Sequence, residues 1–190
     1  MAEPITIVAG LPRSGTSMMM RMLEAGGMTV VTDGERVADI DNPEGYYEYE
    51  RVKQIKDDAS WIPDTRGKVF KMVSLLLYHL PKNETYRIVL MRRAVEEVLA
   101  SERKMLIRLG KDPDHAPDDR MADIFKKHLT HLEGWLAAQK HISVLQVNYN
   151  QVLNDSENAL RPVAGFCGGL DLARMVAIVD PNLYRNRKSE

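Results

Sequence analysis

Cysteine is nearly absent from this chain, since Cys167 is the single one among 190 residues. One thiol excludes an intramolecular disulfide and fits a reducing compartment. No apolar run is long enough to span a bilayer, and the first four residues lead straight into a short apolar stretch without the basic and apolar regions of a signal peptide. We therefore expect a cytoplasmic protein without a membrane partner.

An excess of positive charge is also absent. Lysine and arginine number 26 against 27 aspartates and glutamates, which gives a formal net charge of −1. Dedicated nucleic-acid binders usually carry a basic excess, so we expect no nucleic-acid partner. The length is typical of one domain, and neither repeats nor a linker interrupt it, so a single domain over 1–190 is predicted.

A lysine is missing from the most informative segment, Gly10–Ser17, which follows the apolar run Ile5–Ala9. The pattern is that of a strand, a glycine-bearing turn and a helix start, which directs backbone N–H groups at a phosphate or sulfate. Its spacing meets the glycine requirement of G-x-x-x-x-G-K-[ST], but Thr16 stands in the lysine position. Arg13 supplies a cation instead. The segment predicts an anion site that is poorly equipped for ATP or GTP hydrolysis.

Apolar strands alternate with helical stretches along the chain. This alternation predicts an α/β, three-layer P-loop fold, with a central, mostly parallel sheet of about five strands flanked by helices and with ligands at the carboxyl ends of the strands. We expect strands over Ile5–Ala9, Met28–Val31, Val69–Val73, Ile88–Met91 and Ile142–Val147, and helices over Gly15–Ala25, from Val95 through Leu106, and over Met121–Gln139, the last preceded by Asp118 and Asp119.

Two segments together resemble the sulfotransferase family. Leu11–Ser17 is similar to the family's P-[KR]-S-G-T-[ST] loop, and the strand Tyr86–Met91 is followed by Arg93 and, eight residues later, by Ser101. The resemblance, to a short bacterial-type member, implies that 3′-phosphoadenosine 5′-phosphosulfate (PAPS) is the co-substrate. It implies that Arg13, Ser14, Gly15, Thr16 and Ser17 hold the 5′ end of the donor, while Arg93 and Ser101 bind its 3′-phosphate. Arg92 is the alternative to Arg93, and Val147–Tyr149 resembles the family's strand-to-tyrosine element.

The catalytic lysine and base of the family are only partly matched. Lys71-Met-Val73 resembles the K-[TS]-H element of cytosolic members, in which the lysine stabilises the leaving group and the histidine deprotonates the acceptor, but valine takes the histidine position. The resemblance implies a catalytic role for Arg13 and Lys71. No metal is expected, because only Asp33 follows a predicted strand in a position suited to a metal ligand.

The replacement base is predicted in the acidic, tyrosine-rich segment 41–50. Other branches of the family use a glutamate, and burial in a cleft raises the basicity of a carboxylate. Glu48 is preferred, with Glu44, Glu50 and His79 as alternatives. The segment also fits a turn that leads into a helix burying Val52 and Ile55.

Three further questions stay open at the level of sequence. The 111–120 segment is either a solvated connection or a lid over the acceptor, and the basic residues of 184–188 either form a terminal tail or contact the donor. We expect sulfuryl transfer to a hydroxyl or amine of an unidentified small-molecule or peptide acceptor. The alternatives are a metal-dependent nucleotide or small-molecule kinase, which Thr16 disfavours, and a non-catalytic nucleotide-binding module, which Val73 favours.

Overall fold

A computed structural model describes residues 3–34, 45–112 and 118–179. Glu44, the centre of the 111–120 segment and the basic residues of 184–188 lie outside these ranges. Predictions that concern them therefore stay predictions.

The centre of the molecule is a sheet whose strands are all parallel. It consists of β1 (Ile5–Gly10), β2 (Val69–Val73), β3 (Tyr86–Arg92) and β4 (Ile142–Asn148), in the spatial order β2-β1-β3-β4. Every residue of β1 is buried, as a continuous apolar run at the middle of a parallel sheet requires. Because β1 pairs with β2 on one side and β3 on the other, the carboxyl end of β1 lies where the strand order reverses, the usual ligand site of such folds.

The strand predicted over Met28–Val31 contributes a single bridge, between Val30 and Val69, so the described part of the sheet has four strands. The segment is short, and beyond Val31 the chain leaves β2. The hydroxyl of Thr32 and the amide of Asp33 both donate to the carbonyl oxygen of Glu48 instead. The fold class is as predicted, with this fifth element reduced.

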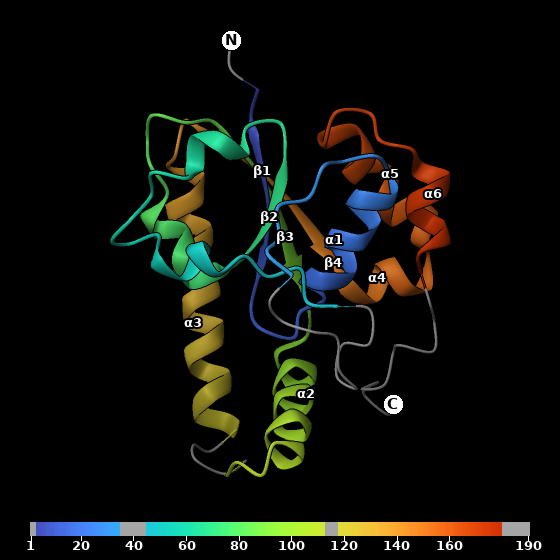
Figure 1. Ribbon diagram of the computed structural model, residues 1–190. Coiled ribbons are helices and arrows are strands. Elements are labelled where there is room, and N and C mark those ends of the chain that lie inside the picture. Colours follow the sequence, from blue (N-terminus) through green and yellow to red (C-terminus); the bar gives the residue numbers. More distant parts are fainter. Residues whose placement is uncertain (1–2, 35–44, 113–117, 180–190) are drawn as a thin grey trace.

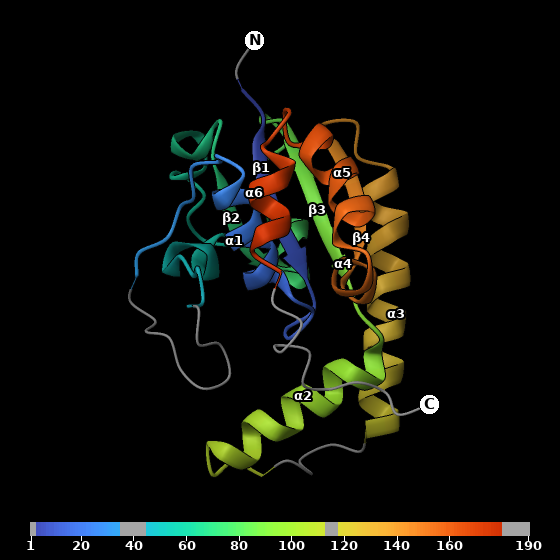
Figure 2. The same ribbon diagram turned by 90° about the vertical axis from the view of Figure 1, so that its right-hand side faces the viewer.

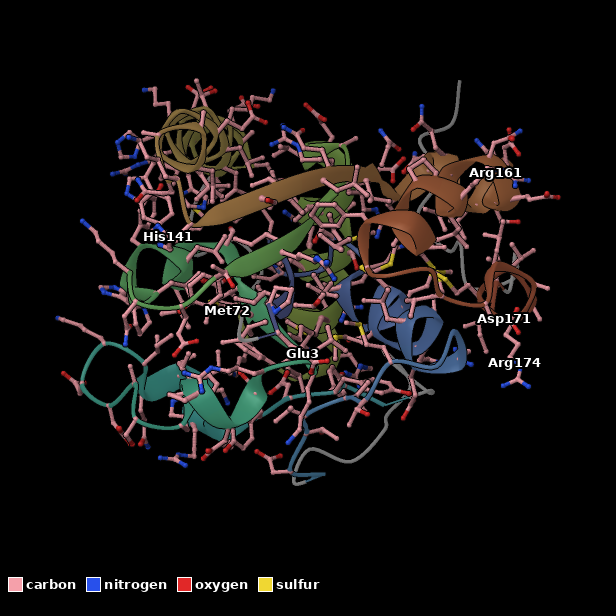
Figure 3. All side chains as sticks on the ribbon, turned by 90° about the horizontal axis from the view of Figure 1, so that it is seen from above. Glu3, Met72, His141, Arg161, Asp171 and Arg174 are labelled. Atoms are coloured by element: carbon pink, nitrogen blue, oxygen red, sulfur yellow. The ribbon has the colours of Figure 1, made fainter. Side chains whose placement is uncertain are left out.

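Helices cover both faces of the sheet (Figure 1). One face packs against α1 (Thr16–Ala25), α4 (Tyr149–Asn154), α5 (Ser156–Phe166) and α6 (Leu172–Ala177). The other packs against α3 (Asp118–Ala137) and the short 3₁₀ helices η1 (Glu50–Gln54), η2 (Ile62–Thr65) and η3 (Ser74–His79). Seen from above, Arg161, Asp171 and Arg174 lie at the outer side of the α5 and α6 layer, away from the strands (Figure 3).

Helix α2 (Val95–Arg108) and the first turns of α3 extend beyond the carboxyl ends of the strands (Figure 2). The buried apolar residues of α2 lie in its first half, whereas those of α3 lie in its second half. Leu11, directly after β1, packs with Val98 and Leu129 and so joins both helices to the turn after β1. The two helices thereby flank the edge of the sheet at which ligands are expected.

Among the described residues, no helix combines the length and the apolar character needed to cross a bilayer.

Cys167 is buried, and this burial raises the pKa of its thiol to about 11. The thiol therefore stays protonated at neutral pH and has little nucleophilic character.

Candidate active site

The backbone of the turn after β1 lies very close to neighbouring groups. Gly15 adopts φ 93° as the N-cap of α1, and Ser14 donates its hydroxyl to the carbonyl oxygen of Leu11 at 2.7 Å. A Cβ atom on Gly10 would lie 2.4 Å from Oγ of Ser14, so glycine is needed there. We call residues Gly10–Ser17 the anion loop, because the first N–H groups of α1 and the positive end of its dipole suit a bound anion.

Arg13, Arg93 and Ser101 meet at this loop although they lie far apart in the sequence. Nε of Arg13 donates to Oγ of Ser101 at 3.0 Å, and Nη1 of Arg93 donates to the carbonyl oxygen of Arg13, also at 3.0 Å. The fold thus joins the two sequence segments on which the family resemblance rests. Two guanidinium groups and a hydroxyl at a helix N-terminus are groups that suit a polyanionic ligand.

Arg92, the alternative to Arg93, points elsewhere. Its Nη1 lies 2.7 Å from Oε1 of Glu133 on α3, on the opposite side of the sheet from α1. Arg93 lies directly after the end of β3, and its Nη1 reaches the carbonyl oxygen of Arg13 in the anion loop. Of the two arginines, Arg93 is therefore the one at this loop.

Lys71 lies on β2 beside the start of α1. Its Nζ contacts Oγ of Ser17 at 3.3 Å, the carbonyl oxygen of Tyr46, and Oε1 of Glu48 at 3.7 Å. Ser17 donates to the same carbonyl oxygen at 3.1 Å. The predicted lysine, the predicted base and the last residue of the anion loop are therefore brought together at one point.

Glu48 lies between two ammonium groups, since Nζ of Lys53 is also 3.7 Å from its carboxylate. Its side chain is only 18% exposed, whereas Glu50 is 42% exposed and pairs with Lys53 at the surface. The helical interpretation of this segment is confirmed too, because η1 buries Val52 and Ile55 on the sheet. Glu48 precedes that helix and remains directed at Lys71.

Backbone strain is concentrated at this site. Among the described residues, Arg13 (φ 65°) and Tyr47 (φ 52°) are the two non-glycine residues in the left-handed region. Each such residue costs roughly 1–3 kcal/mol and persists only where its surroundings hold it. Tyr47 is anchored by its hydroxyl, which donates to Glu24 of α1 at 2.6 Å. One strained residue lies in the anion loop, and the other directly precedes Glu48.

A histidine that the sequence did not single out lies beside the end of β2. Nε2 of His128, on α3, is 2.9 Å from Oγ of Ser74, whereas His79 is exposed at the end of η3. Ser74 follows Val73, the residue in the family's histidine position. No local signal could have revealed His128, because the contact spans 54 residues.

The environment of His128 predicts a pH effect on stability. Burial, and secondarily the nearby His131, lowers the pKa of His128. The unfolded chain, with a histidine pKa near ~6.5, then binds more protons than the folded protein in mildly acidic solution. We expect the free energy of unfolding to fall as the pH drops through ~6.5 and to level off below the folded pKa.

Urea denaturation between about pH 5 and pH 8 measures this dependence. His128→Gln should flatten the profile. The same slope in wild type and variant would contradict the assignment.

The described residues contain no group of three or more histidine, cysteine, aspartate or glutamate side chains placed to hold a metal ion. Asp33, the one residue considered for that role, instead accepts a hydrogen bond from the amide of Glu50. Asp33 therefore helps to hold the segment that contains Glu48 in place.

A comparison with known protein families identifies the family of the chain. The family model described as "Sulfotransferase domain" matches residues 3–181. The chain belongs to the sulfotransferase family. Membership of this family supports transferase activity in general terms. No curated protein matches the chain by sequence.

Solved structures of other sulfotransferases share the fold at low identity. The sulfotransferase domain of the curacin biosynthetic pathway is 14% identical, with a TM-score of 0.53 over 99% of this chain and 79% of that one. The domain from the olefin synthase of Synechococcus PCC 7002 is 15% identical, with a TM-score of 0.52 over 98% and 84%. A sulfotransferase from Alicyclobacillus acidocaldarius is 14% identical, with a TM-score of 0.50 over 98% of each chain. These similarities concern the fold alone.

Proposed function

We propose that this sulfotransferase moves a sulfuryl group from PAPS to a hydroxyl or amine of a small-molecule or peptide acceptor. The observation that carries the proposal is the meeting of Arg13, Arg93 and Ser101 at the N-terminus of α1. A donor with phosphate at both its 5′ and 3′ positions needs cations and N–H groups at two points, and this arrangement supplies both.

Donor binding divides between the two halves of the site. Arg13 and the N–H groups of residues 15–17 suit the 5′-phosphosulfate, since a helix N-terminus stabilises an anion. Ser101 and Arg93 suit the 3′-phosphate. Nε and Nη1 of Arg93 are used within the protein, so Nη2 is the nitrogen that we assign to the ligand.

The transfer step follows from the positions of Lys71 and Glu48. The acceptor oxygen or nitrogen forms a bond to sulfur while the bond from sulfur to the bridging phosphate oxygen breaks. The electron pair of that bond leaves with the adenosine bisphosphate, where Arg13 and Lys71 offset the charge. Glu48 takes the proton from the acceptor. Fixed cations suffice here, because a sulfuryl group carries less charge than a phosphoryl group.

A metal-dependent kinase and a non-catalytic nucleotide-binding module are the two alternative functions. A metal-dependent kinase would need the lysine that Thr16 replaces. A non-catalytic nucleotide-binding module would explain Val73 in the histidine position, but the contact between Lys71 and Glu48 favours a catalytic site. The single cysteine and the balanced charge support a cytoplasmic setting without nucleic-acid or membrane partners.

Donor choice is the first test of the proposal. We expect calorimetry to show binding of 3′-phosphoadenosine 5′-phosphate in buffer without magnesium, and much weaker binding of ATP. The anion loop lacks the lysine that reaches β- and γ-phosphates, and Arg93 and Ser101 recognise a 3′-phosphate that ATP does not have. Tight, magnesium-dependent binding of ATP with no response to the bisphosphate would favour the kinase instead.

The acceptor can be sought with the same protein. A panel of hydroxylated and amine-bearing metabolites and peptides, incubated with 35S-labelled PAPS, reports any transfer directly. Binding of the bisphosphate without transfer to any compound on a broad panel would favour the non-catalytic module.

A further inference from the structure

The guanidinium group of Arg93 is turned into the protein rather than toward solvent. Its side chain is only 6% exposed, and Nε donates to Oε2 of Glu97 at 2.9 Å. The group also lies 4.4 Å from the ring centroid of Tyr149, at cation–π distance. An arginine that only bound a ligand would not need both an ion pair and a cation–π contact within the protein.

The partners of Arg93 are themselves tied to the anion loop and to one another. Asn150 donates Nδ2 to Oε1 of Glu97 at 3.1 Å, so both carboxylate oxygens of Glu97 accept hydrogen bonds. Tyr149 packs against Gly15 so closely that a Cβ atom there would lie 2.4 Å from its ring. Glu97 belongs to α2 and the other two residues to α4, so the start of each helix contacts the same arginine.

The remaining contact of Arg93 is made to the backbone of the anion loop. Nη1 donates to the carbonyl oxygen of Arg13, the loop residue that holds a left-handed conformation without being glycine. A donor fixed at this carbonyl oxygen orients the peptide group that follows Arg13. It therefore favours the conformation in which the Arg13 side chain reaches Ser101.

We propose that Glu97, Tyr149 and Asn150 are positioning residues that hold Arg93 against the carbonyl oxygen of Arg13 and so keep the anion loop in its binding conformation. This inference rests on the proposed function for its meaning, since the loop is the part that binds the 5′ end of the donor. Glu97 and Asn150 act through Arg93 and need no contact with the donor themselves. Their loss should therefore weaken ligands that lack the 3′-phosphate as well, because the loop binds the 5′ end of both kinds of ligand.

Matched nucleotides separate this role from direct recognition. 3′-Phosphoadenosine 5′-phosphate and adenosine 5′-monophosphate differ only in the 3′-phosphate. Glu97→Gln and Asn150→Ala should weaken the monophosphate between about threefold and tenfold, a part of what a full charge-assisted contact contributes, and the bisphosphate by at least the same factor, because Arg93 also contacts its 3′-phosphate. Glu157→Gln is the matched control, because Glu157 also pairs with an arginine four residues away, Arg161, but is 64% exposed on α5. It should bind both nucleotides like wild type.

A double-mutant cycle tests whether the effect passes through Arg13. If Glu97 acts by positioning Arg13, Glu97→Gln should cost little further affinity in a protein that already carries Arg13→Ala. A general loss of structure would instead weaken binding equally in both backgrounds. Additive losses, or a loss confined to the bisphosphate, would overturn the proposal.

A measurement without any nucleotide keeps the inference separate from the proposed function. Hydrogen exchange of the amides in residues 10–17 should be at least about fivefold faster in Glu97→Gln and Asn150→Ala than in wild type and Glu157→Gln. Unchanged exchange in both variants would overturn the positioning role even where nucleotides bind. Faster exchange in the two variants, together with a wild-type protein that binds neither nucleotide, would leave the positioning role intact and reject the proposed donor.

Discussion

Replacing Glu48 by glutamine is expected to lower turnover by roughly 10²–10⁴ with an acceptor in hand, while donor affinity stays close to that of wild type. Glutamine keeps the size of the side chain but cannot take a proton from the acceptor. Glu48 is placed for this role by its contact with Lys71 at 3.7 Å and by its low exposure of 18%. Steady-state kinetics with labelled PAPS measure the effect, together with the affinity for the bisphosphate.

The neighbouring candidates supply the controls for Glu48. Glu50→Gln changes an exposed carboxylate that pairs with Lys53, and His79→Ala changes an exposed residue at the end of η3. Both should turn over the acceptor at nearly the wild-type rate. If Glu48→Gln kept full turnover while Glu44→Gln, Glu50→Gln or His79→Ala lost it, the role of base would pass to that residue. No loss in any of the four variants would leave transfer to positioning and electrostatics.

The central sheet could be predicted because its signal is local. β1 and β2 are mostly apolar segments bounded by turn residues, and the described strand β2 coincides with the predicted range Val69–Val73. The start of α3 was equally readable, since Asp118 and Asp119 occupy its first turn. Met28–Val31 has the same apolar character, but its extent depends on where the following residues find hydrogen-bond partners. These residues find their partner in the carbonyl oxygen of Glu48, a residue distant in sequence.

The anion loop could be placed from spacing, but its supports could not. Glu97 resembles any acidic residue in the first turn of a helix, and Asn150 any polar residue after a strand. Their relation appears only when α2 and α4 are brought to the same arginine. Likewise, sequence left Arg92 and Arg93 as alternatives, and only their contacts in the fold decide between them, with Glu133 for Arg92 and with the carbonyl oxygen of Arg13 for Arg93.

Removal of Arg13 should weaken 3′-phosphoadenosine 5′-phosphate and adenosine 5′-monophosphate alike, each by about 10- to 150-fold. Arg13 is assigned to the 5′ end of the donor, which both ligands present to the N-terminus of α1. Arg93→Ala should weaken the bisphosphate more than the monophosphate. It removes a direct contact with the 3′-phosphate as well as the support that Nη1 gives to the Arg13 carbonyl oxygen. Calorimetry on both variants with both nucleotides measures the four affinities.

The ratio of the affinity for the bisphosphate to the affinity for the monophosphate decides the assignment of Arg93. General destabilisation of the loop affects both ligands equally and leaves this ratio unchanged. Arg92→Ala is the matched control: it removes the adjacent arginine, which pairs with Glu133 on the other face of the sheet, and should leave the ratio unchanged. Ser101→Ala should lower the ratio as Arg93→Ala does, since its hydroxyl is assigned to the same phosphate. If Arg93→Ala reduced both affinities by one common factor in a protein that remained folded, Arg93 would serve only to position Arg13. The 3′-phosphate would then have to be bound by other residues.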